Sequence, residues 1–363
     1  MERKRLGRSN LYVSPIGLGC RRLGFRPETR GEAIEVVERA VELGMNFIDT
    51  ANIYGGGISE EIVGEAIQPW RRRVVLATKG GIVVTPEGLA TQDLRPESVR
   101  RAVRESLRRL QTDYIDLYQI HYPDPATPFS ETINALEEFL ETGEIRYVGL
   151  SNFSPEELKE WCDLMEVPSI QVPYNLLQRR AYRDLLPLCE ERRISMITYT
   201  PLLMGLMTGK IRRDMVFRGD ERSIIPRHII ESCVRITEQL RPLAEKYGRS
   251  IVQVILNYLA RRPGVGCVLV GASSVAQVEE NAKAMEWTLL PEDQALVDKI
   301  VEDVGDGLDG ESFVQDVREV FWNYAGKLIA VLEMGMKFPV PPKIKAGDGI
   351  KISWNGEYLG VVK

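Results

Sequence analysis

Short apolar runs alternate with longer amphipathic segments along the first 300 residues. The apolar runs are rich in β-branched residues, and the segments between them contain ten or more residues with helical periodicity; from Ser98 to Leu110, apolar residues recur at spacings of three and four. This alternation predicts βα units and a parallel sheet, and eight strands are the number that closes a (β/α)8 TIM barrel. The expected strands are residues 16–19, 46–49, 74–79, 115–121, 145–150, 169–172, 195–199 and 267–271.

Segments outside this alternation predict additions to the α/β barrel. Residues 3–15 favour a small N-terminal hairpin that turns at residues 8–10. Beyond the barrel domain (residues 1–300), residues 301–310 are acidic and glycine-rich and are expected to form a linker. Apolar residues at helical spacing over 312–334 predict a helix, and Asn355-Gly356 between two alternating runs predicts a β-hairpin.

The extension, residues 301–363, is therefore expected to be a second unit built from a linker, a helix and a hairpin. A lone hairpin is only marginally stable in water. We expect the extension to pack on the barrel or on a neighbouring subunit, which favours a homo-oligomer.

Two long connections, residues 80–95 and 201–227, follow predicted strands three and seven, and loops of this length often carry function.

Composition narrows the function classes. The 363 residues are 44% hydrophobic and 27% charged with a net charge of −5, which argues against general nucleic-acid binding. Five scattered cysteines without a Cys-x-x-Cys pair, and a start without an apolar leader, favour free thiols in the cytoplasm. Two distant histidines argue against a metal site, and no run approaches the ~18 apolar residues of a membrane span. A small molecule is the expected partner.

Four polar residues stand at or just after the ends of predicted strands: Asp49, Tyr54, Lys79 and His121. The C-terminal strand ends of a (β/α)8 barrel converge on one mouth, so these side chains are expected to meet. A phenol with a pKa near 10 is a weak acid at neutral pH; a neighbouring lysine lowers that pKa, and an aspartate keeps the lysine charged. A histidine can polarise a carbonyl oxygen. The set predicts Tyr54 as the general acid of a carbonyl reduction.

The segments around these residues resemble the aldo-keto reductase family. The resemblance covers residues 1–300, is closest in type to the potassium-channel β-subunit and aryl-alcohol dehydrogenase-like branch, and does not extend to the C-terminal residues. It implies an NAD(P)-dependent oxidoreductase in which Asp49, Tyr54, Lys79 and His121 are catalytic. The segments that carry it are 49–55, 57–60, 77–80, 117–121, 145–153, 171–175, 271–274 and 280–281.

The same resemblance implies where a dinucleotide binds. Ser151, Asn152 and Gln171 would hold the nicotinamide carboxamide, and Tyr199 would stack on the ring, although Tyr199 as a core aromatic stays open. A long loop would contact the pyrophosphate, and residues near 271–281 the adenosine end, where a helix start offers N–H groups to phosphate. The implied cofactor residues are Gly19, Cys20, Asp49, Ser151, Asn152, Gln171, Tyr199, Thr200, Pro201, Leu202, Gly205, Lys210, Arg222, Gly271, Ser273, Gln277, Glu280 and Asn281.

Cofactor preference and substrate are less constrained. Many relatives carry an arginine at the position of Gln277, which would pair with the 2′-phosphate of NADP, and its absence leaves NAD open. The paired Ser273 and Ser274 resemble relatives of the channel β-subunit type that take NADP without this arginine, so we expect NADP. Arg21, Tyr54, His121 and Tyr122 are the expected substrate contacts. Arginines near the mouth indicate either an anionic carbonyl or sugar substrate, or solvated side chains paired with the protein's own carboxylates.

Two alternatives to a carbonyl reductase remain. One is a dinucleotide-binding regulatory or redox-sensing subunit of the channel β-subunit type, in which the extension recruits a partner. The other is a sugar epimerase that oxidises and re-reduces one substrate with a tightly held cofactor.

Overall fold

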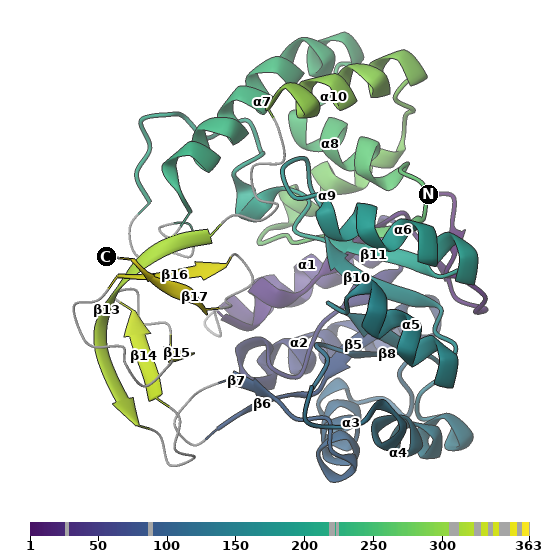
Figure 1. Cartoon of the computed structure of the whole chain (residues 1–363). Helices are drawn as coiled ribbons and strands as arrows, with labels where there is room; N and C mark the ends of the chain where they lie inside the picture. Colours follow the sequence, from purple (N-terminus) through teal and green to yellow (C-terminus); the bar gives the residue numbers. More distant parts are fainter. Residues whose placement is uncertain are drawn as a thin grey trace.

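The computed structural model describes residues 1–25, 29–85, 90–217, 222 and 225–304, and the backbone of five strands between residues 312 and 362. In the described part of the chain, eight parallel strands close into a barrel (Figure 1). Each of the eight predicted strands is confirmed. The barrel strands are β3 (Ile16–Gly19), β4 (Phe47–Asp49), β5 (Val75–Gly80), β8 (Leu117–Ile120), β9 (Val148–Ser151), β10 (Ser169–Pro173), β11 (Ser195–Tyr199) and β12 (Val265–Val270).

The strands follow one another around the barrel in chain order, with β12 closing on β3. This order brings the carboxyl ends of all eight strands to one mouth. In the strand register, Gly19 on β3 lies beside Asp49 on β4, and Lys79 on β5 lies beside Gln119 on β8. Residues that close different strands, far apart in sequence, therefore share one edge.

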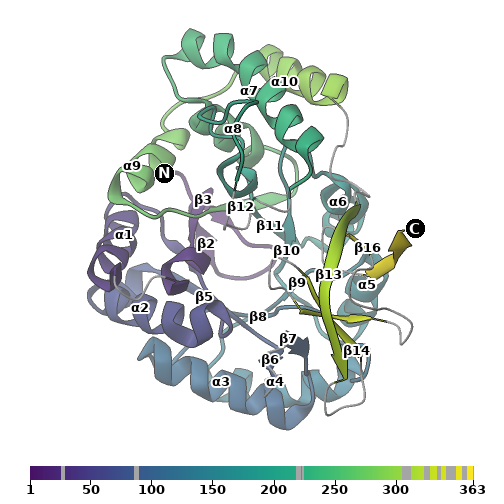
Figure 2. The same ribbon diagram turned by 90° about the vertical axis from the view of Figure 1, so that its left-hand side faces the viewer.

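Helices surround the barrel, as Figure 2 shows. Their starts follow local chemistry: α5 and α8 begin with capping boxes at Ser154 and Ser250, in which the serine oxygen accepts from a backbone N–H of the first turn. The helices are α1 (Arg30–Glu42), α2 (Ile58–Ile67), α3 (Pro96–Leu110), α4 (Phe129–Thr142), α5 (Pro155–Leu164), α6 (Arg180–Arg192), α7 (Arg227–Tyr247), α8 (Ile251–Ala260), α9 (Val275–Ala282) and α10 (Pro291–Val304).

The N-terminal hairpin predicted over residues 3–15 is confirmed as β1 (Lys4–Arg5) paired with β2 (Tyr12–Val13). Leu6 and Val13 pack with Phe47 and Leu117, which come from the barrel strands, in a buried apolar cluster. Lys4 donates to the carbonyl oxygens of Ala260 and Val265 at 2.6 and 3.0 Å. The hairpin is thereby fixed against β12.

The connection at residues 80–95 contains a short antiparallel pair, β6 (Ile82–Val84) and β7 (Ala90–Gln92). The connection after β11 contains the short helix η5 (Leu203–Gly205) and leads to α7. Two further short helices, η1 (Arg21–Phe25) and η3 (Tyr54–Gly57), follow β3 and β4 at the mouth.

The C-terminal extension differs from the prediction. Residues 312–334 were expected to be helical, and this prediction is wrong: they contain β13 (Ser312–Trp322) and β14 (Leu328–Leu332). The linker expected over residues 301–310 also needs correction, because its first four residues are helical: α10 runs to Val304, and residues 305–310 lie outside the described residues. Helical spacing was outweighed here by the β-branched and aromatic content of the segment, which favours strands.

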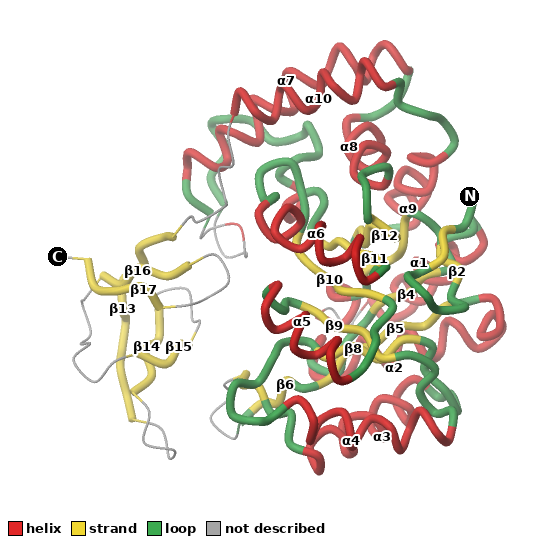
Figure 3. Tube along the Cα trace, turned by 45° about the vertical axis from the view of Figure 1, so that its right-hand side comes forward, coloured by secondary structure: helices red, strands yellow, loops and turns green. Residues whose placement is uncertain are grey.

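The predicted C-terminal hairpin is confirmed as β16 (Gly349–Ser353) paired antiparallel with β17 (Tyr358–Val362). Together with β15 (Lys337–Val340), these strands form a five-stranded sheet in the order β15-β14-β13-β16-β17. Figure 3 shows them as a group of strands distinct from the barrel. Helices long and apolar enough to cross a bilayer are absent from the described ranges.

Candidate active site

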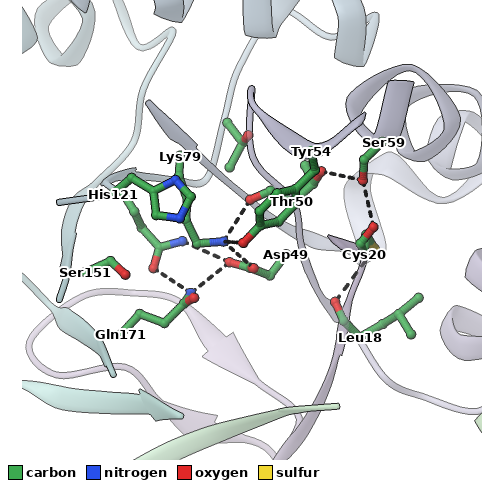
Figure 4. Close-up of polar contacts among 12 residues, drawn as sticks. Leu18, Cys20, Asp49, Thr50, Tyr54, Ser59, Lys79, His121, Ser151 and Gln171 are labelled. Carbon is green, nitrogen blue, oxygen red and sulfur yellow. Dashed lines mark hydrogen bonds and ion pairs between the residues drawn. The ribbon is translucent and has the colours of Figure 1, made fainter. Parts of the chain in front are cut away.

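The four strand-end residues meet at the mouth of the barrel, and Lys79 is at their centre (Figure 4). Its ammonium group donates to Asp49 Oδ1 at 2.5 Å, to the Thr50 carbonyl oxygen at 2.9 Å and to the Tyr54 hydroxyl at 3.4 Å. Three acceptors use the three donors of the ammonium. The Lys79 side chain is 1% exposed, so the pair with Asp49 is shielded from solvent.

The partners of the Lys79 ammonium stabilise its positive charge. Burial alone lowers the pKa of Lys79, but Asp49 and Tyr54 outweigh burial, and the net pKa is raised. Lys79 is therefore an ammonium ion at neutral pH. A buried ammonium is stable only when paired and hydrogen-bonded, and the site meets that condition.

The pKa of Tyr54 corrects one expectation. We expected Lys79 to lower it; Lys79 does act in that direction, but burial of the phenol outweighs it and the net pKa is raised. Burial disfavours the phenolate more than one ammonium at this distance stabilises it. Tyr54 is thus a protonated phenol in this structure, which is the form that donates a proton.

A glycine-rich turn fixes Tyr54. Gly55, Gly56 and Gly57 all have positive φ angles, of 60°, 66° and 102°. A Cβ at Gly55 would lie 2.0 Å from the carbonyl oxygen of Gly24 in η1, and one at Gly57 would lie 2.8 Å from the Arg109 side chain. Only glycine fits this conformation and these contacts, so the turn holds the phenol against β5.

His121 lies beside the phenol as a neutral imidazole. Its ring centroid is 5.9 Å from that of Tyr54 in an edge-on arrangement and 5.4 Å from that of Tyr122 in a stack. Burial and the Lys79 charge hold the pKa of His121 well below its ordinary value. Its Nδ1 atom is buried without a hydrogen-bond partner among the described residues. The imidazole can therefore hydrogen-bond a ligand without carrying charge.

The Asp49 carboxylate has two further hydrogen-bond partners, and the sequence did not lead us to expect either of them beside Asp49. Asp49 Oδ2 accepts from the side-chain amides of Gln119 at 3.0 Å and Gln171 at 2.9 Å. Gln171 was expected to be a cofactor residue, but Gln119 was missed. Its signal was available: it stands two residues before His121 within the expected strand 115–121, and alternate strand residues share a face.

Expected cofactor residues at the ends of β9, β10 and β11 lie together. The Asn152 amide donates to the His121 carbonyl oxygen and the Ser151 hydroxyl, both at 3.0 Å, and its backbone N–H donates to the Gln171 carbonyl oxygen at 3.0 Å. The Tyr199 hydroxyl donates to Asn152 Oδ1 at 2.8 Å. Asn152 therefore joins the mouth ends of four strands.

Backbone conformation supports a ligand role for these loops. Of the non-glycine residues with positive φ in the described ranges, Gln111 and Arg193 end helices, where such angles are common. The remaining ones are Asn152 and Thr200, which were expected to be cofactor residues, and Leu203 and Met204, which lie between the expected residues Leu202 and Gly205. Strained backbone of this kind clusters at ligand sites, because the surrounding structure must maintain it.

The start of α9 presents the expected adenosine residues. Gln277 Oε1 accepts from the Ser273 backbone N–H at 2.8 Å, and both residues are exposed. Asn281 is only 4% exposed, yet no hydrogen bond of its side chain to another described residue is present. Glu280 is half-buried beside it.

The other expected site residues surround the same mouth or lie on the loop after β11. Gly19 and Gly271 are neighbours, since a Cβ at Gly271 would lie 3.7 Å from the Gly19 carbonyl oxygen. Cys20 is fully buried, and Arg21 is exposed at the start of η1. The loop after β11 carries Pro201, Leu202, Gly205, the exposed Lys210, and Arg222, whose guanidinium lies 4.4 Å from the Phe217 ring centroid.

A second buried ion pair lies behind Lys79 and was also missed. Glu60 is fully buried; it pairs with Arg109 at 2.7 Å and accepts from the Thr78 hydroxyl at 2.7 Å. Thr78 precedes Lys79 on β5, and Arg109 supports the turn at Gly57. The pair thus connects the supports of Lys79 and Tyr54.

Known proteins of one family resemble this chain. The model of the Aldo/keto reductase family matches residues 15–302. Aldo-keto reductase YhdN of Bacillus subtilis is 35% identical, with 88% of this chain and 99% of that protein covered. The NADH-specific methylglyoxal reductase of Escherichia coli is 34% identical (83% and 99%). A probable voltage-gated potassium channel subunit beta of Arabidopsis thaliana is 31% identical (79% and 92%).

Solved structures give the same result. The glycerol dehydrogenase AKR11B4 from Gluconobacter oxydans superposes with a TM-score of 0.79 at 32% identity, with 84% of this chain and 96% of that chain covered. An aldo/keto reductase from Klebsiella pneumoniae in complex with NADP and acetate superposes with a TM-score of 0.67 at 30% identity (83% and 96%).

Proposed function

Since the chain belongs to the aldo/keto reductase family, we propose that it is an NAD(P)H-dependent oxidoreductase that interconverts a carbonyl group and an alcohol. The substrate class is an aldehyde, ketone or sugar. The observation that carries the proposal is the buried Lys79 ammonium, which contacts both Asp49 and the Tyr54 hydroxyl at the mouth of the barrel.

Each residue has a role that follows from its surroundings. Tyr54 is the general acid in reduction and the general base in oxidation, because its phenol is protonated and hydrogen-bonded to Lys79. The Lys79 charge stabilises the phenolate once the proton has left. His121 hydrogen-bonds the carbonyl oxygen as a neutral donor. The nicotinamide cofactor supplies or accepts the hydride.

The chain offers a path for this cofactor across the mouth. Ser151, Asn152 and Gln171 would hold the carboxamide, and Tyr199 would face the ring. The left-handed loop at Thr200 to Gly205 would approach the pyrophosphate, since such turns direct backbone N–H groups to anions. Asn281 and Glu280 on α9 would contact the adenosine.

We propose NADP as the preferred cofactor, with NAD also accepted. A relative named NADH-specific and a neighbour bound to NADP both resemble this chain. At the start of α9, Gln277 stands where a cation would pair with the 2′-phosphate. Discrimination against NAD by charge is therefore expected to be weak.

A second candidate is favoured by two observations: the likeness to a probable potassium channel subunit, and the five-stranded extension beyond the family model. In that case the barrel would bind dinucleotide as a redox signal, and the extension would bind a partner or a second copy of this chain. Truncation after Val304 distinguishes the two candidates: if turnover survives while assembly is lost, the extension serves association.

Five free, buried thiols fit a reducing compartment, and the proposed location is the cytoplasm.

The experiment that tests the main proposal follows absorbance at 340 nm with NADPH or NADH and a reactive aromatic aldehyde. Tyr54→Phe is compared with the wild type, and dinucleotide binding to both is measured by tryptophan fluorescence. Oxidation of NADPH by the wild type alone, with equal binding, supports Tyr54 as the acid. Equal oxidation by both proteins contradicts it. Purified protein that retains dinucleotide and consumes none supports an epimerase or a sensor.

A further inference from the structure

Gln119 lies in the barrel at the level of Lys79, its partner in the strand register. It lies on β8, its side chain is fully buried, and its Cα is in register with Lys79 on one side and Gly149 on the other. A Cβ at Gly149 would lie 3.2 Å from Gln119 Cγ, so a glycine at this position of β9 leaves space for the glutamine. The Gln119 side chain extends past β9 to reach Gln171 on β10.

The Gln119 amide uses both of its ends in hydrogen bonds. Its Nε2 donates to Asp49 Oδ2 at 3.0 Å, and its Oε1 accepts from Gln171 Nε2 at 3.0 Å. Gln171 Nε2 donates in addition to Asp49 Oδ2 at 2.9 Å. These hydrogen bonds close a triangle among the side chains of Gln119, Gln171 and Asp49, which we call the amide triangle (Figure 4 labels Gln171 and Asp49).

We propose that Gln119 is a positioning residue for the reaction. It orients Asp49 towards Lys79 and fixes the amide of Gln171 at the mouth. This inference rests on the proposed function. Asp49 Oδ2 is occupied by two amides, so Oδ1 is left for Lys79, and the carboxylate cannot rotate without breaking two buried hydrogen bonds. Buried hydrogen bonds to a charged group are among the stronger ones, and their loss is expensive.

The amide triangle also determines what Gln171 can offer to a ligand. Both hydrogens of its NH2 group are used by Asp49 and Gln119. Only its carbonyl oxygen remains, which is an acceptor. A bound carboxamide must therefore present its NH2 group to Gln171. Without Gln119 the amide of Gln171 loses one of its two acceptors and this preference weakens.

Only an amide satisfies both neighbours at this position. A methionine has similar length but neither donates nor accepts strongly, and an ionised glutamate would accept from Gln171 but repel Asp49. A protonated glutamate is equivalent to glutamine, because its O–H donates and its C=O accepts. The pair of variants Gln119→Met and Gln119→Glu therefore separates hydrogen bonding from packing.

The test compares kcat, KM and dinucleotide Kd of the wild type and both variants, with thermal unfolding as a check of the fold. Tyr118→Phe is the matched control: Tyr118 is the neighbouring buried residue on β8, and its hydroxyl has no hydrogen-bond partner among the described residues. For Gln119→Met we expect kcat about 10–100-fold lower, the range for outer residues that orient functional ligands. The aldehyde KM should change little, the Kd for NADPH should rise, and Tyr118→Phe should behave as the wild type.

Gln119→Glu gives a pH signature that a purely structural role would not produce. Burial and the Asp49 charge raise the pKa of the introduced carboxyl, so it is protonated at low pH. At about pH 6 its kcat/KM should lie within about 3-fold of the wild-type value, and by about pH 8.5 it should fall more than 10-fold further than that of the wild type, as the group ionises.

Two results would overturn the role of Gln119: wild-type kcat and dinucleotide Kd in folded Gln119→Met, or a pH profile of Gln119→Glu that matches the wild type. If Gln119→Met does not fold, the pH profile of Gln119→Glu decides. Failure of the proposed function looks different, since the wild type would then reduce no carbonyl substrate; in that case NADPH affinity of the variants still reports on the amide triangle.

Discussion

Lys79 and Asp49 form an ion pair in the interior of the barrel mouth, with 2.5 Å between Nζ and Oδ1 and with side chains that are 1% and 4% exposed. The pair joins two adjacent strands, β4 and β5. A buried pair of this kind is neutral as a unit but unstable as a single charge. Its two members therefore depend on each other for folding and, in the proposed reaction, for catalysis.

Lys79→Met is expected to destabilise the fold by about 3–5 kcal/mol, because Asp49 is left as a buried charge without its counter-ion. Turnover should be lost as well, since no charge remains to stabilise the Tyr54 phenolate. Chemical denaturation followed by circular dichroism measures the first effect, and NADPH oxidation the second. The double variant Lys79→Met/Asp49→Asn should recover part of the stability but none of the activity; a double variant that is less stable than the single one would contradict this account.

Stability should depend on pH through His121. In the unfolded chain this histidine takes up a proton near its ordinary pKa of 6.5, whereas in the fold its pKa lies well below that value. Below about pH 6.5 the unfolded state therefore binds more protons, and the free energy of unfolding falls as pH falls, with a slope that approaches about 1.4 kcal/mol per pH unit. Denaturation at several pH values between about 7.5 and 5.5 measures it.

His121→Asn is the control for this slope. It removes the titrating group, so the variant should lose less stability than the wild type over the same pH interval. Equal losses in both proteins would assign the pH dependence to other groups.

The Glu60–Arg109 pair should be essential for stability and should affect turnover only through Lys79 and Tyr54. Arg109→Met leaves a fully buried carboxylate with the Thr78 hydroxyl as its remaining side-chain donor among the described residues, so a loss of about 3–5 kcal/mol is expected. Thermal unfolding measures it. Arg100→Met, which breaks the exposed pair with Glu138 on α4, is the matched control and should lower the melting temperature much less, because solvent screens an exposed ion pair.

Cofactor preference should respond to a single charge at the start of α9. In Gln277→Arg, a guanidinium replaces the exposed amide that now caps the Ser273 N–H, and it can pair with a 2′-phosphate. The ratio of kcat/KM with NADPH to that with NADH should rise about 10–100-fold, which corresponds to about 1.5–3 kcal/mol for a charge-assisted hydrogen bond. An unchanged ratio would place the 2′-phosphate away from this helix.

The barrel could be predicted from sequence because its information is local. Each strand is a short apolar run between amphipathic helices, and right-handed βαβ connections leave few ways to arrange such units. The extension could not be predicted in the same way. Residues 312–322 carry apolar positions at helical spacing, but β13 pairs with β14 and with β16. The β16 partners run from Gly349, opposite Asp316, to Ser353, opposite Ser312, far along the chain from β13. Pairing partners that distant do not appear in a local pattern.

The site shows the same division. Asp49, Tyr54, Lys79 and His121 could be identified because strand ends of a barrel must converge. Gln119 stood within the same segment as His121 and received no role, because its importance comes from two partners, Asp49 and Gln171, that are 70 and 52 residues away. Glu60 was likewise part of a quoted segment, and only the fold shows that Arg109 neutralises it.

The sequence by itself determined the (β/α)8 barrel and the four residues at its mouth, since strand periodicity and strand-end position are properties of short stretches of chain. The segments expected to surround a dinucleotide came from the resemblance to the aldo-keto reductases. Tertiary structure alone decided the protonation states and the second set of partners. Burial outweighs Lys79 at Tyr54 and keeps His121 neutral, and two amides hold Asp49 in one orientation. These effects depend on depth and on distances between separate strands, which exist only once the barrel is closed.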